Sequence, residues 1–213
     1  MSSTVLLVHG GLWEPMDAEK FWGTPGITAG LTSAGLTVFA PDRPKDPSGW
    51  DVELEALGEL LANHAGPLTI VGASNGCTVA ALLTLVYPDL VERLVLAWPA
   101  TAGDAGVDTL VLAGLLGRGC AADDAEKLLA GDTLRGTTDG DLIELARIPV
   151  AVLPSLLENP THQRQTVDAL LGLIAGSREL PGCPEPPRPA FSSNQISPPY
   201  LDQFVRTIVE FVK

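Results

Sequence analysis

Short apolar runs alternate with longer stretches of helical pattern along most of this sequence. Five runs are rich in aliphatic and β-branched residues, and each reaches a glycine or a proline within two residues of its end: 4–8, 36–40, 68–71, 94–97 and 149–153. Uninterrupted runs of this length are typical of strands buried on both faces, as in a parallel sheet. Apolar residues at helical spacing predict helices at 51–64, 79–87, 165–175 and 200–212. The alternation predicts an α/β fold with a mostly parallel twisted sheet and helices on both faces.

The chain has 213 residues, which is long enough for one sizeable core and short for two, so we expect a single domain over 1–213. Two segments interrupt the alternation. Residues 100–147 resemble two or three short helices, which form either a decorated crossover or a small helical lid over a site. Residues 181–199 are rich in proline and serine and predict an irregular loop, after a last short strand candidate at 178–180.

The charge balance excludes several classes of partner. Lys and Arg number 13 against 26 Asp and Glu, so the net charge is −13 and no basic footprint for a nucleic acid or an anionic membrane exists. No apolar run is long enough to span a bilayer, and the N-terminus has no signal-peptide pattern. The three cysteines and three histidines are too dispersed for a metal site. We therefore expect a cytoplasmic protein without a metal or an organic cofactor, whose partner is a small-molecule substrate; the oligomeric state is not readable.

The segment 72–76 reads Gly-Ala-Ser-Asn-Gly, between a predicted buried strand and an Ala/Leu-rich helix. Gly-x-Ser-x-Gly in this context is the pattern of a nucleophile elbow, a sharp turn that holds the serine in a strained backbone conformation at a helix N-terminus. The flanking glycines avoid collisions within the turn. We therefore interpret Ser74 as a nucleophile; the alternative is a helix N-cap at a tight turn.

A second motif follows the first predicted strand, where residues 9–13 read His-Gly-Gly-Leu-Trp. A glycine-rich turn exposes backbone N–H groups, and one from Gly11 or Leu12 could form an oxyanion hole with the N–H of Asn75. His9 is expected to fix this loop by hydrogen bonding rather than to act in catalysis. Trp13 is expected either to line the substrate pocket or to pack in the core.

These motifs together resemble the α/β-hydrolase family, and the resemblance covers nearly the whole chain. It rests on the order of the glycine-rich turn at 9–11, the strand that ends at Pro41 and Asp42, the elbow at Ser74, and the stretch 87–97 that leads into the next strand. The family's two opening antiparallel strands have no counterpart, which implies a minimal member. The resemblance implies the α/β-hydrolase fold and a serine nucleophile assisted by a histidine and an acid.

The triad that the resemblance implies is incomplete in this sequence. The family's acid position falls on Asn159, which cannot carry a negative charge, and Glu158 next to it is the first substitute. Asp104 and Asp42 are the other acid candidates. No histidine follows the last predicted strand, where the family keeps its base, and His162 is the best replacement because its loop lies at the same rim as Ser74. The alternative for His162 is a surface histidine in the first turn of a helix.

The sequence therefore predicts a serine hydrolase, such as an esterase, that acts on an ester, a thioester or a lactone. Because a properly placed acid is missing, a slow or specialised enzyme is expected. A non-hydrolytic protein of the same fold, which binds a small molecule or acts as a cyclase or lyase without a working triad, is the alternative. A protein-interaction scaffold is a third possibility.

Overall fold

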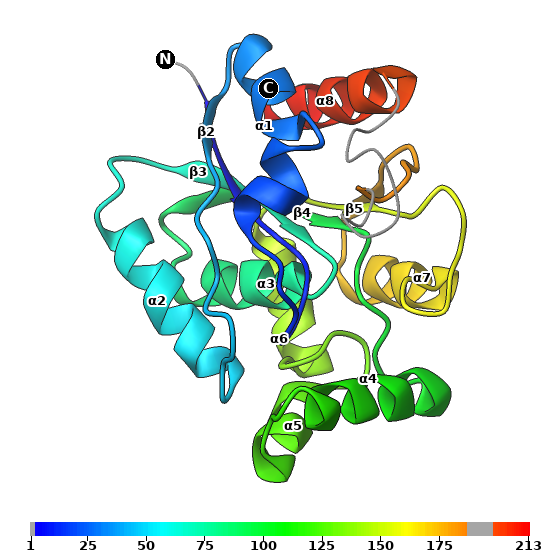
Figure 1. Ribbon diagram of the computed structural model, residues 1–213. Helices are drawn as coiled ribbons and strands as arrows, with labels where there is room; N and C mark the ends of the chain where they lie inside the picture. Colours follow the sequence, from blue (N-terminus) through cyan, green and yellow to red (C-terminus); the bar gives the residue numbers. More distant parts are fainter. Residues whose placement is uncertain (1–2, 187–197) are drawn as a thin grey trace.

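The computed structural model describes residues 3–186 and 198–213 and is organised around one six-stranded sheet (Figure 1). All neighbouring strands pair in parallel, in the order β2-β1-β3-β4-β5-β6. The strands are β1 (Thr4–Val8), β2 (Thr37–Phe39), β3 (Leu68–Ala73), β4 (Val91–Ala97), β5 (Val150–Leu153) and β6 (Arg178–Glu179). A parallel sheet places the carboxyl ends of all its strands at one edge, and that edge is where a site can form.

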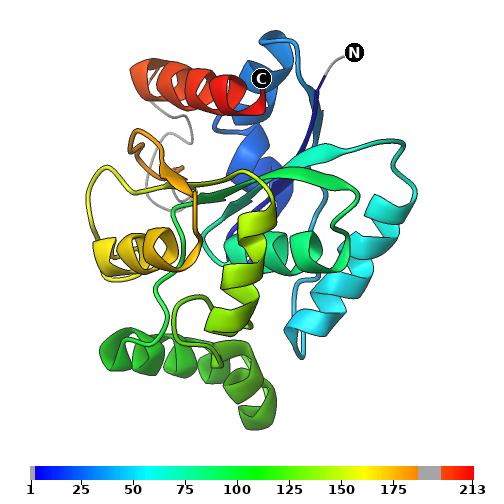
Figure 2. The same cartoon turned by 180° about the vertical axis from the view of Figure 1, so that it is seen from behind.

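Helices cover both faces of the sheet (Figures 1 and 2). One face carries α1 (Ile27–Ser33) and α8 (Pro198–Val212), which contact each other, with the short π-helix η1 (Glu19–Gly23) beside α1. The other face carries α2 (Trp50–Ala62), α3 (Gly76–Val86), α6 (Asp139–Glu144) with the 3₁₀-helix η2 (Leu145–Arg147), and α7 (Arg164–Leu173). The remaining pair, α4 (Ala105–Gly117) and α5 (Ala122–Leu129), stands together at one end of the molecule, away from the strands.

Alternate residues along each central strand enter two separate cores. In β3, Ile70 faces the core beneath α2 and α3, whereas Val71 faces the core beneath α1 and α8. This explains the uninterrupted apolar runs of the four central strands, because most of their residues are buried, whereas the edge strands β2 and β6 are more exposed. The second core contains a group of stacked rings, with the Trp98 and Phe204 centroids 5.4 Å apart.

The structure confirms the α/β fold class and all six predicted strands, with β4 beginning three residues before its apolar run. The four predicted helices are confirmed with shifts of a few residues at their ends. The segment 100–147 contains α4, α5 and α6, as the pattern of short helices predicts. The sequence reading missed η1 and α1, and part of its predicted loop at 181–199, residues 187–197, lies outside the described residues. Within the described residues, no helix has the length and apolar character needed to cross a membrane.

Candidate active site

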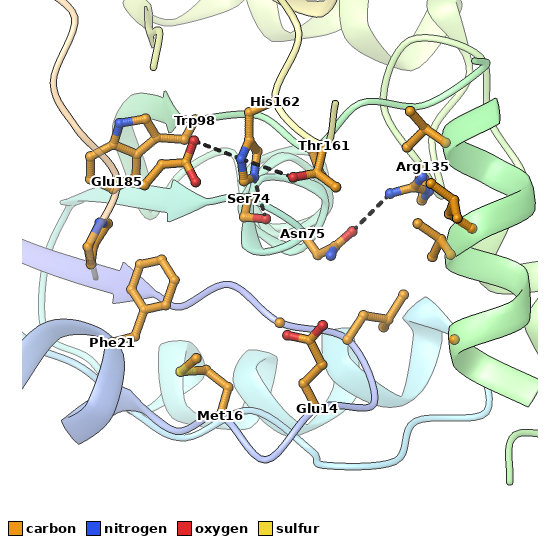
Figure 3. A pocket seen from close by; sticks show the side chains of 18 of the residues that line it. Glu14, Met16, Phe21, Ser74, Asn75, Trp98, Arg135, Thr161, His162 and Glu185 are labelled. Carbon is orange, nitrogen blue, oxygen red and sulfur yellow. Dashed lines mark hydrogen bonds and ion pairs between the residues drawn. The ribbon is translucent and has the colours of Figure 1, made fainter. Parts of the chain in front are cut away.

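A cavity of about 240 Å³ lies where the loops after β1, β3, β4, β5 and β6 meet, with α4 on one side. Its walls include Gly11, Ser74, Trp98, His162 and Glu185 from these five loops, in that order. Figure 3 shows the side chains of Ser74, Trp98, His162 and Glu185 close together on one side of the open space. The cavity therefore gathers short segments that are up to 174 residues apart in the sequence, counted from Gly11 to Glu185.

Ser74 stands at the sharp turn between β3 and α3, with a φ of 52°. A positive φ is unfavourable for a residue with a side chain, and such strain is common where a side chain must be presented to a ligand. The turn requires its flanking glycines because a Cβ on Gly72 would lie 2.5 Å from the Gly76 carbonyl oxygen. A Cβ on Gly76 would lie 2.5 Å from the carbonyl oxygens of Val8 and His9. The geometry is that of a nucleophile elbow pressed against the end of β1.

His162 contacts Ser74 directly. Its Nε2 lies 2.9 Å from Ser74 Oγ, and its Nδ1 lies 2.9 Å from Glu185 Oε1 (Figure 3). A carboxylate only accepts hydrogen bonds, so Nδ1 carries the hydrogen and donates a hydrogen bond to Glu185. In the neutral imidazole this leaves Nε2 as the acceptor for the Ser74 hydroxyl. His162 is thus oriented to receive a proton from Ser74, and its side chain is only 8% exposed.

Glu185 lies in the loop after β6 and receives two hydrogen bonds besides that from His162. Ser155 Oγ and Asn159 Nδ2 both donate to Glu185 Oε1, the latter at 2.7 Å. Burial raises the pKa of the Glu185 carboxyl, but these bonds and the attraction of His162 outweigh burial and hold the pKa below its ordinary value. Glu185 is therefore ionised at neutral pH, the form that stabilises an imidazolium.

Pairing between two loops brings Glu185 to His162. The loop after β6 runs beside the loop after β5, since Leu156 N donates to Cys183 O at 3.0 Å and Cys183 N donates to Pro154 O at 3.2 Å. On the other side, Thr101 holds the residues that flank His162. Its backbone N–H donates to Thr161 O, and its hydroxyl accepts from Gln163 N. The imidazole is thus fixed through both of its neighbours in the chain.

The structure does not bring the predicted acids to His162. Glu158 is exposed and accepts a hydrogen bond from Arg164 N, and Asp42 accepts one from Ala18 N. Asp104 caps the N-terminus of α4. The acid beside His162 is Glu185 instead, because the loop that contains Glu158 turns it toward the start of α7.

Asn159, at the acid position that the resemblance implies, donates to Glu185 and so helps to hold its carboxylate. The two loops have exchanged roles relative to that resemblance. The loop after β5 carries the histidine, and the loop after β6 carries the acid. Glu185 lies in the same loop in which a histidine was expected. The presence of a carboxylate in that loop was the sequence signal from which Glu185 could have been predicted as the acid.

The predicted oxyanion residues Gly11, Leu12 and Asn75 all line the cavity with Ser74. The loop after β1 approaches the elbow closely, since a Cβ on Gly10 would lie 2.9 Å from the Cβ of Ser74. Trp13 does not line this cavity. Its Nε1 donates to Pro47 O at 2.9 Å, and its ring packs against the core beneath α2 and α3. Trp13 therefore packs against the core, which is the second of the two positions expected for it.

A buried polar network holds the loop after β1. Arg43 forms two hydrogen bonds with the fully buried Glu53, and its Nη1 donates to the carbonyl oxygens of His9 and Gly11 at 2.7 and 2.9 Å. His9 Nδ1 donates to Gly10 O and its Nε2 accepts from Arg43 N. Burial, with the nearby charge of Arg43, lowers the pKa of His9 to about 4, so the ring is neutral. His9 supports the loop, as expected from its place in the motif.

Comparisons with known proteins find the same fold in solved structures. No match is found among models of protein families, and none among curated protein sequences. NosK from Streptomyces actuosus is similar at 20% identity with a TM-score of 0.64, over 99% of this chain and 97% of that one. The meta-cleavage product hydrolase CumD from Pseudomonas fluorescens IP01 is similar at 20% identity with a TM-score of 0.67, over 99% of this chain and 90% of that one. A predicted CIB-like hydrolase from Thermoplasma acidophilum is similar at 19% identity with a TM-score of 0.62, over 99% of this chain and 86% of that one. The chain has the fold of the α/β-hydrolase family.

Proposed function

We propose that the protein is a serine hydrolase that cleaves an ester, a thioester or a lactone. The observation that carries the proposal is the chain of contacts from Ser74 Oγ through the imidazole of His162 to Glu185 Oε1, with both distances at 2.9 Å. A serine hydroxyl is a weak nucleophile until a neighbouring base takes its proton. The contacts give Ser74 that base and give the base an ionised partner. The similarity to solved hydrolases agrees with this class of reaction.

The reaction proceeds in two half-reactions. Ser74 Oγ attacks the carbonyl carbon as its proton passes to His162 Nε2, and the tetrahedral intermediate collapses as His162 returns that proton to the leaving oxygen or sulfur. The acyl group stays on Ser74. A water molecule then attacks the acyl carbon, gives its proton to His162, and releases the acid as the proton returns to Ser74 Oγ. Glu185 stabilises the imidazolium in both halves.

The negative charge on the carbonyl oxygen requires donors on the cavity wall. The N–H of Asn75, the residue after the nucleophile, is one donor, and the N–H of Gly11 or Leu12 is the other. All three residues line the cavity beside Ser74. The Arg43 bonds to the carbonyl oxygens of His9 and Gly11 favour a fixed path for this loop, so its N–H groups need little reorganisation during the reaction.

The contacts at Glu185 remove the sequence-based reason to expect a slow enzyme, because the acid needed to orient His162 is supplied by the loop after β6. They also weaken the non-hydrolytic alternative, which rested on the lack of a histidine within reach of Ser74. A binding protein would have no need of a hydrogen-bonded serine, histidine and carboxylate at the floor of its pocket.

Hydrolysis of p-nitrophenyl esters tests the proposal with four variants. We expect Ser74→Ala and His162→Ala each to lower kcat by about 10⁴-fold or more, and the double variant to lose little beyond either one, because the two residues act as a unit. His64→Ala, which lies before β3 at the opposite end of that strand from Ser74 and is not among the cavity residues, is the control and should retain activity. Activity that survives in Ser74→Ala would overturn the proposal.

A further inference from the structure

The charges on the cavity wall run against those of the whole chain. Acidic residues outnumber Lys and Arg by 26 to 13 in the sequence, whereas the cavity is lined by Lys20, Arg118 and Arg135 against Glu14 and Glu185. Glu185 is occupied by the donors described above. Lys20 is occupied by Asp17, whose carboxylate lies 2.5 Å from its Nζ. The remaining cations on the wall are the two arginines near α4, of which Arg135 is paired with Asp108.

Arg135 is the more deeply placed of the two arginines. It lies between α5 and α6, its side chain is 2% exposed, and its guanidinium reaches the elbow (Figure 3). Nη1 donates to Asn75 Oδ1 at a long 3.3 Å, and Nη2 donates to Asp108 Oδ1 at 2.9 Å. Its Nε is buried and has no hydrogen-bond partner among the described residues. A buried N–H that lacks a partner is unfavourable, so the guanidinium is only partly satisfied where it lies beside the cavity.

We propose that Arg135 binds a carboxylate of the substrate, so that the substrate is an ester, thioester or lactone that carries an anionic group near the scissile carbonyl. This inference rests on the proposed function of Ser74. A substrate carboxylate that accepts a charge-assisted hydrogen bond from Nη1 would replace this long bond to Asn75 and add a partner to a guanidinium that the described residues satisfy only in part. Because Asn75 follows Ser74 directly, the anion would lie only a few bonds from the reacting carbon.

The neighbouring groups favour Arg135 over the other cations as the anchor. The Arg118 side chain is exposed, and the one hydrogen bond described for it is a 3.5 Å approach of Nη2 to Leu12 O. Glu14 lies across the cavity from Arg135 and would repel an anion, whereas the carboxylate of Asp108 on α4 is already paired with Arg135 (Figure 3). Leu110 and Val111 of α4 line the same end and provide apolar contact for the carbon chain between the two carbonyl groups.

A matched pair of substrates tests the inference: mono-p-nitrophenyl adipate and its methyl ester, which share leaving group and acyl chain and differ by one negative charge. We expect the wild type to cleave the charged ester with a kcat/KM at least about tenfold higher, the range of a charge-assisted hydrogen bond. Arg135→Gln should reduce this preference to within about twofold. Arg135→Lys, which keeps the charge but lacks the planar guanidinium with its several N–H donors, should give an intermediate preference. The ratio cancels any effect of Arg135 on Asn75 that both esters share.

Lys127→Gln removes one positive charge from α5 outside the cavity and is the control, which should keep the wild-type preference. A wild type that cleaves both esters equally well, or a preference that persists in Arg135→Gln, would overturn the inference and leave the proposed function intact. A wild type that cleaves neither ester and forms no adduct with a neutral fluorophosphonate would instead overturn the proposed function, and the inference with it.

Discussion

At the scale of single residues, the site depends on ionisable side chains that their hydrogen-bond partners keep in one protonation state. Glu185 fixes the tautomer of His162, and the bonds from Ser155 and Asn159 keep the Glu185 carboxylate ionised. In the loop after β1, the neutral ring of His9 donates to Gly10 O and accepts from Arg43 N. A proton added to His9 would remove that acceptor and place a second cation beside Arg43.

His9 should therefore make the stability of the fold depend on pH. Its pKa is about 4 in the folded chain and about 6.5 when unfolded, so between these values only the unfolded chain binds the proton. The free energy of unfolding should then fall as the pH falls from 6.5 to 4, by at most about 3 kcal/mol. Urea unfolding at pH 7 and pH 4.5 measures this, and His9→Asn should lose less stability between them than the wild type. Equal losses in the two proteins would contradict the role given to His9.

The sequence predicted Ser74 and its contact with His162 better than it predicted the acid. The elbow is a local motif, and its glycines can be read from five consecutive residues. The choice between Glu158 and Glu185 depends on which loop passes His162, and this is decided by the bonds between Cys183 and residues 154–156. Such cross-loop bonds leave no pattern in the order of residues.

At the scale of elements, the close approach of α3 to β1 positions Ser74. The elbow leaves no room for a Cβ at Gly72 or Gly76, so β3, the turn and α3 act as one rigid unit. The four central strands were predictable because burial on both faces makes them largely apolar. The helix α1 was missed because its seven residues include a glycine and two threonines, which give a weak helical signal.

Two glycine substitutions separate close packing from helix propensity. Gly76→Ala should destabilise the fold by about 1–3 kcal/mol, because the new methyl group would meet two carbonyl oxygens of β1 and the residue after it. Gly172→Ala in α7 meets no atom within 4 Å and should be neutral or stabilising by up to about 1 kcal/mol. Thermal unfolding of both variants checks this. A Gly76→Ala variant as stable as Gly172→Ala would show that the elbow is looser than described.

At the scale of the whole molecule, the parallel sheet assembles the site by collecting its loops at one edge. The histidine after β5 and the acid after β6 occupy each other's positions relative to the resemblance seen in the sequence, yet both loops end at the same rim, so the contacts survive the exchange. The fold fixes where the groups meet and leaves open which loop supplies each one. This freedom is why the sheet could be predicted from the sequence and the acid could not.

The central claim is that Ser74 is activated by His162 and that Glu185, not Glu158, orients that base. The rate at which a fluorophosphonate adds to the protein, followed by intact mass, tests it most directly, because it needs no knowledge of the substrate. We expect one adduct on the wild type, none on Ser74→Ala, a rate lowered by about 10²- to 10⁴-fold in Glu185→Gln, and a wild-type rate in Glu158→Gln. A Glu185→Gln variant that reacts as fast as the wild type, or a Glu158→Gln variant that loses its reactivity, would contradict the claim.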